Sequence, residues 1–125
     1  MNKTILLVAL LQIAPAAGAE VMNCNVSGES LFNLINLDTE SKQAVLTDSY
    51  GRNTQGKITL VRDAGNGKSK FNVSLEYAIN DTPTHIDMII VPVYEEEYKV
   101  GMAGYSGTGK KKLLDIVSGG KAMCF

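Results

Sequence analysis

The sequence predicts a small all-β domain, an up-and-down antiparallel β-barrel of about eight strands. Short segments of alternating apolar and polar residues recur along the chain, and turn-forming residues separate them at intervals of roughly 8–15 residues. Two cysteines, Cys24 and Cys124, lie near the two ends of the domain. A closed barrel pairs every strand edge, which an open sheet leaves available for aggregation. A β-sandwich is the alternative, although the chain has no tryptophan to form an immunoglobulin-type core.

Residues 1–19 have the pattern of a cleaved signal peptide. Lys3 gives a positive start, Ile5 to Leu11 form an apolar run, and Ala17-Gly18-Ala19 supplies the small residues of a cleavage site. The apolar run is shorter than the roughly 20 residues that a membrane-spanning helix needs. We therefore expect residues 20–125 to form a single exported β domain, periplasmic or extracellular, with no integral membrane segment.

The charge of the expected mature chain argues against nucleic acid as a partner. Removing Lys3 from the 12 Lys and Arg residues leaves 11 against 13 Asp and Glu, a net charge of −2. Nucleic acids and anionic membrane surfaces both attract chains with a basic excess. The 106 residues from 20 to 125 suffice for one core, and we expect a monomer.

Cys24 and Cys124 are predicted to form a disulfide. They are the only two cysteines, and an even number in a small exported domain favours a disulfide. The bond requires the first and last strands to lie side by side, with Cα atoms about 5–6 Å apart. A reactive thiol or metal pair is the alternative. Two cysteines and the single His85 cannot complete a four-ligand zinc site without carboxylates, and we expect no metal and no cofactor.

The clearest strand covers residues 71–79, because its odd-numbered residues are all apolar and share one face of a strand. Segment 56–62 repeats the pattern more weakly, with Ile58 and Leu60 on one face. Segment 85–94 is apolar on both faces in its second half, which favours a central or doubly covered strand.

Turn-forming residues at 48–53, 63–67 and 80–83 separate these segments. Residues 31–37 also fit a short helix, because three of their apolar residues have helical spacing. The complete pattern predicts strands near 21–26, 31–38, 42–48, 56–62, 70–79, 85–94, 97–104, 111–117 and 121–125.

Two motifs resemble enzyme signatures but lack essential parts. Residues 104–111 almost match the phosphate-binding P-loop, but Lys111 stands where a Ser or Thr would bind magnesium. Ser118-Gly-Gly-Lys121 matches the S-x-x-K pattern of β-lactamases, but its two glycines oppose a helix and the companion motifs are missing. Both segments are better explained as hairpin turns.

His85 is the only histidine, so any nucleophile–histidine mechanism has to use it. Asp87 is expected on the same face of its strand, which is also the ordinary arrangement of exposed polar neighbours. Glu95–Glu97 could supply carboxylates for calcium or glycoside chemistry, but a solvated turn is the simpler interpretation. Residues 63–67 lack the ligand order of an EF-hand. No complete catalytic constellation emerges, and the sequence predicts a protein that is not an enzyme.

The segment 105–110 resembles a loop of the periplasmic inhibitors of host lysozymes. Those proteins are small exported β-barrels, often with a disulfide near the termini, and they present a Ser-Gly-x-x-Tyr loop to the lysozyme cleft. Ser106 and Gly107 match the first two positions, whereas Lys110 stands where the family has Tyr. The resemblance implies that Ser106 forms a hydrogen bond in the cleft and that Lys110 pairs with an acidic group there.

We therefore predict an exported, non-catalytic β-barrel that binds a protein partner or a small ligand through its loops. A lysozyme-inhibitor-like protein acting through residues 105–112 and a structural subunit of a surface assembly are the alternatives. The acidic turn at 94–98 is a second candidate surface. The predicted binding loop comprises Tyr105, Ser106, Thr108, Lys110, Lys111 and Lys112.

The interior of an eight-stranded barrel has room for a side-chain core or for one small ligand. The sequence does not separate the two, and a filled core is the preferred interpretation. The residues expected to line the interior are Phe71, Leu75, Tyr77, Ile86, Met88 and Ile90.

Overall fold

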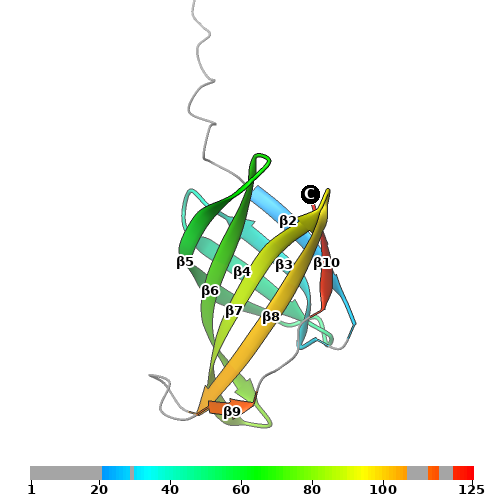
Figure 1. The fold of residues 1–125 in the computed structure, drawn as a ribbon. Helices are drawn as coiled ribbons and strands as arrows, with labels where there is room; N and C mark the ends of the chain where they lie inside the picture. The colour runs from blue at the N-terminus through cyan, green and yellow to red at the C-terminus, as the bar shows by residue number, and fades with distance from the viewer. Residues whose placement is uncertain (1–20, 29, 107–112, 116–119) are drawn as a thin grey trace, which may run out of the picture.

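The computed structural model describes residues 21–28, 30–106, 113–115 and 120–125. Nine antiparallel strands run through these residues as one sheet, which closes because β10 pairs with both β2 and β8 (Figure 1). The ring has eight strands, and β9 pairs with the end of β8. The strands are β2 (Val21–Ser27), β3 (Phe32–Asp38), β4 (Gln43–Asp48), β5 (Asn53–Gly65), β6 (Lys68–Ile79), β7 (Thr82–Tyr94), β8 (Glu97–Ser106), β9 (Leu113–Asp115) and β10 (Lys121–Cys124).

The predicted barrel is thus confirmed, and it excludes the β-sandwich. The segment with helical spacing is strand β3, because its inward residues Ile35 and Leu37 complete the barrel interior. The spacing of apolar residues in so short a segment fits a helix as well as a strand.

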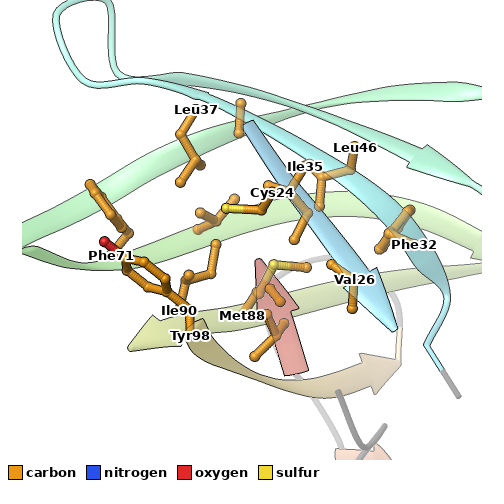
Figure 2. Packing of buried hydrophobic residues seen from close by; sticks show 14 of the residues in the cluster. Cys24, Val26, Phe32, Ile35, Leu37, Leu46, Phe71, Met88, Ile90 and Tyr98 are labelled. Carbon is orange, nitrogen blue, oxygen red and sulfur yellow. The ribbon is translucent and has the colours of Figure 1, made fainter. Parts of the chain in front are cut away.

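Alternate residues of the strands point inward and form a packed apolar core. Side chains from β2, β3, β4, β6, β7 and β8 converge there (Figure 2). Phe32 and Phe71 are the largest fully buried side chains. Tyr77 is only partly buried, although it packs against the core. The other five predicted interior residues, Phe71, Leu75, Ile86, Met88 and Ile90, are all buried.

One prediction about strand faces is wrong, and a second is right in only one of its two alternatives. Leu60 does not share the inward face of Ile58, because the register against β6 shifts between them. This β-bulge inserts one residue and leaves Leu60 37% exposed. Strand β7 is central, because it pairs with both β6 and β8. It is not doubly covered, since Ile89 and Val93 on its outer side are 49% and 51% exposed. Inward-facing and outward-facing residues alternate along a barrel strand, so only the inward face is covered by the core.

The disulfide predicted between Cys24 and Cys124 is present and joins the closing strand β10 to β2. The neighbouring pair, Asn23 and Phe125, exchanges two backbone hydrogen bonds of 2.9 Å. The two cysteines are therefore a non-hydrogen-bonded pair, the position at which side chains of antiparallel strands come closest. Their Cα atoms are 4.0 Å apart, and both residues are buried.

Hydrogen bonds to the carboxylate of Asp48 order the turn between β4 and β5. Asp48 Oδ1 accepts the backbone N–H groups of Tyr50 and Arg52, each at 2.9 Å. Its Oδ2 accepts Arg52 Nε at 2.8 Å and the Tyr77 hydroxyl at 2.9 Å. Burial by itself would raise the pKa of Asp48, but these hydrogen bonds lower it from 3.8 to about 2. The carboxylate thus ties this turn to β6 and explains why Tyr77 is not a pure core residue.

Replacing both cysteines by alanine is expected to lower the free energy of unfolding by about 3–5 kcal/mol. The bond spans 100 residues, and its loss restores conformational freedom to the unfolded chain. Urea unfolding followed by far-UV circular dichroism measures the difference. Reduction of the disulfide in the wild type should lower the free energy of unfolding by the same amount. A loss below about 1 kcal/mol would show that strand pairing alone closes the barrel.

Candidate functional site

His85 is held between two carboxylates on the outer face of the barrel. The β6–β7 register places it opposite Glu76, and Asp87 lies two residues along the same face. The Nδ1 atom is 2.5 Å from Glu76 Oε2, and Nε2 is 2.9 Å from Asp87 Oδ1. Ser74 donates its hydroxyl to Asp87 Oδ1 at 2.9 Å. These four residues, Ser74, Glu76, His85 and Asp87, form the His85 cluster.

The geometry of the His85 cluster favours a protonated histidine. An imidazolium donates from both ring nitrogens, and here both nitrogens face carboxylate oxygens. Burial by itself would lower the pKa of His85. The hydrogen bonds and charges of Glu76 and Asp87 outweigh burial and raise this pKa above 6.5.

This arrangement lacks the contact on which a histidine-activated nucleophile depends. The Ser74 hydroxyl is bonded to Asp87 and not to the imidazole of His85. Both nitrogens of His85 are already paired, so neither is available to accept a proton from a serine. In the His85 cluster the imidazole and the two carboxylates bind one another, and Ser74 donates a hydrogen bond to Asp87.

A shallow groove of about 470 Å³ borders His85 on the outer face of β4 to β7. The register places Lys57 of β5 between Gln43 of β4 and Ser74 of β6. Amide, ammonium, hydroxyl and carboxylate groups therefore converge, and together they offer both donors and acceptors. The outer groove is lined by Gln43, Gln55, Gly56, Lys57, Ser74, Leu75, Glu76 and His85.

Gly56, in the lining of the outer groove, lies where neighbouring strands leave little room for a side chain. A Cβ atom there would lie 3.1 Å from Leu46 Cδ1, 3.2 Å from Val73 Cγ1 and 3.3 Å from the Ser74 carbonyl oxygen. Any larger residue has to displace these neighbours, which belong to strands on both sides. Glycine within a strand often marks such a close approach or a barrel corner.

The structure places two residues of the predicted binding loop. Tyr105 and Ser106 end β8, and Tyr105 lies opposite His85 with the ring centroids 6.3 Å apart. The start of the predicted loop thus adjoins the His85 cluster. Four other predicted residues, Thr108, Lys110, Lys111 and Lys112, lie outside the described residues, as does Ser118 of the S-x-x-K motif.

The other sequence-based candidates do not gather into a site of the same kind. Glu95 and Glu96 form the exposed turn between β7 and β8. Asp63 accepts the backbone N–H of Gly65 at 3.0 Å and so stabilises its own turn. Within the described part of the chain, no three His, Cys, Asp or Glu residues form a group that could hold a metal ion. Over the same residues, no helix has the length and apolar character to cross a membrane.

Comparison of the chain with protein-family models, with curated proteins and with solved structures gives no match.

Replacing His85 by Gln tests the charge of the cluster. Because the folded-state pKa of His85 is raised above 6.5, the stability that its protonation contributes is fully present below pH 6.5 and lost as the pH rises through the folded pKa. The wild type should therefore exceed His85→Gln in unfolding free energy by more at about pH 6 than at about pH 9.

An NMR titration of the His85 imidazole gives the pKa directly, and its midpoint is expected above 6.5. In a Glu76→Gln variant the midpoint should move down, because one charged partner is lost. A wild-type midpoint at or below 6.5 would contradict the inference that Glu76 and Asp87 raise the pKa of His85.

Proposed function

We propose that the protein is an exported, non-catalytic binding protein whose outer groove takes a polar, hydroxyl-rich ligand such as an oligosaccharide. The observation that carries this proposal is the convergence of polar side chains from four neighbouring strands around one hollow beside His85. Concave surfaces with a few convergent polar groups are the usual starting point for a ligand site.

The chemistry of the outer groove matches hydroxyl groups, which both donate and accept hydrogen bonds. The amides of Gln43 and Gln55 do the same, Lys57 donates, and the carboxylate of Glu76 accepts. Glu76 keeps half of its side chain exposed while one oxygen bonds His85, so its remaining acceptor capacity faces solvent. The ring of Tyr105 beside His85 adds an aromatic surface at the edge of the site.

The barrel interior is a poor alternative to the outer groove. Large side chains such as Phe32, Ile35 and Met88 are fully buried and belong to one apolar cluster. An eight-stranded barrel leaves space for side chains or for one small ligand, and the apolar core occupies that space (Figure 2). A ligand is therefore expected on the outside.

Titration of the oxidised protein with soluble oligosaccharides of glucose and of N-acetylglucosamine tests the proposal. Backbone amide shifts should concentrate on β4 to β7 around the outer groove. Gln55→Ala should weaken binding about three- to tenfold, the effect of one lost hydrogen bond. The matched control Glu40→Gln, at an exposed position in the β3–β4 turn, should bind like the wild type. Absence of binding by both series, or shifts confined to another surface, would sink the proposal.

A lysozyme-inhibitor-like protein is the second candidate, and two features support it. The closed barrel and the disulfide between near-terminal strands are the layout that the resemblance of residues 105–110 implies. Tyr105 and Ser106 also end β8 at one end of the barrel, where a loop can enter a partner's cleft.

Inhibition of a lysozyme by the purified protein tests this candidate. A Ser106→Ala, Lys110→Ala double variant should lose inhibition, because both groups implied to contact the cleft are removed. The control Gln55→Ala should inhibit like the wild type. Equal inhibition by the double variant would show that this loop is not the contact.

A further inference from the structure

Two hairpins project together from one end of the barrel, the end at which the C-terminus lies (Figure 1). Their tips, β5–β6 and β7–β8, border one hollow of about 350 Å³. Strand β9, next to Tyr105, lies at the opposite end of the barrel (Figure 1). The hairpin-tip cleft is lined by Ala64, Gly65, Asn66, Lys68, Pro92, Val93, Tyr94 and Glu95.

A β-bulge shapes each wall of the hairpin-tip cleft. The β7–β8 register shifts between Pro92 and Tyr94, and the β5–β6 register shifts between Asp63 and Gly65. The residues skipped in the two registers, Val93 and Ala64, both line the cleft. A bulge redirects side chains and often occurs beside functional sites.

The cleft exposes apolar surface that no described element covers. Val93 is 51% exposed and Tyr94 is 70% exposed, and Pro92 beside them restricts the backbone. Lys68 lines the same cleft, and its ammonium stands 5.8 Å from the ring centroid of the buried Tyr98. Exposed tyrosines are typical anchors for a protein partner.

The exposed charges beside Tyr94 are acidic, whereas the cation of the lining, Lys68, is only half-exposed and has its ammonium near the Tyr98 ring. Glu95 and Glu96 follow Tyr94 directly and are both exposed. An arginine or lysine of a partner can lay its apolar stem along Val93 and Tyr94 and bring its charge to the acidic turn. We propose that the hairpin-tip cleft docks a basic segment of a partner protein that also carries apolar side chains. This surface is separate from the outer groove, so either proposal can fail without the other.

Three short synthetic peptides distinguish the parts of this proposal. One alternates Arg and Leu, one alternates Arg and Ser, and one alternates Glu and Leu. The protein should bind the Arg/Leu peptide best, with amide shifts at the two hairpin tips and an affinity that falls with added salt. The Arg/Ser peptide lacks the apolar contact, and the Glu/Leu peptide is repelled by the acidic turn.

Variants at the cleft test the residues. Tyr94→Ala should weaken binding of the Arg/Leu peptide about tenfold, as expected for an aromatic anchor. A Glu95→Gln, Glu96→Gln double variant should remove most of the salt dependence. Tyr50→Ala is the matched control, because Tyr50 is 83% exposed in the β4–β5 turn, outside the cleft. It should bind like the wild type.

Three results would overturn the proposal. The first is no binding of the Arg/Leu peptide, or binding that maps outside the tips. The second is equal binding of the Arg/Ser peptide, which would leave the apolar wall without a role. The third is concentration-dependent self-association in sedimentation with shifts at the same tips, which would make a second copy the occupant.

Discussion

The barrel depends on its closure by β10, a strand of only four residues. Strand β10 pairs with β2 on one side and with β8 on the other, so the core has no open seam there. Few backbone hydrogen bonds hold so short a strand, and the disulfide of Cys24 and Cys124 fixes it at a directly opposed position. The register of the other strands follows from this closure, because a ring allows no strand to slip without displacing its neighbours.

Because apolar side chains fill the interior, both proposed binding surfaces lie on the outside of the barrel. The two proposed surfaces differ in chemistry as a result of their places in the fold. The outer groove lies over the paired strands β4 to β7. Their outward-facing polar residues supply both hydrogen-bond donors and hydrogen-bond acceptors. The hairpin-tip cleft lies between two hairpin tips, where the bulges place apolar residues such as Val93 in the lining and leave them exposed.

Local periodicity was sufficient to predict much of the fold. The alternation over 71–79 determines which side chains of β6 face inward, because successive residues of a strand point to opposite sides. It could not reveal that Leu60 turns outward, since a bulge depends on the pairing with β6. The contact between His85 and Glu76 could not be predicted either. Alternation indicates the strand face on which each residue lies, but their pairing also depends on the β6–β7 register. The contact between His85 and Asp87 could be predicted, because the two residues lie on the same face of one strand.

Closure by the last strand also determines when the fold can complete. The residues that seal the ring are separated from their β2 partners by about a hundred positions, so the final contacts are among the most distant in the chain. Contacts of such separation form slowly, because loop entropy is lost before they stabilise the structure. A growing chain therefore cannot close the ring until β10 (Lys121–Cys124) is available. During that interval β2 and β8 are open edges, and oxidation of the two cysteines can make the closure persistent.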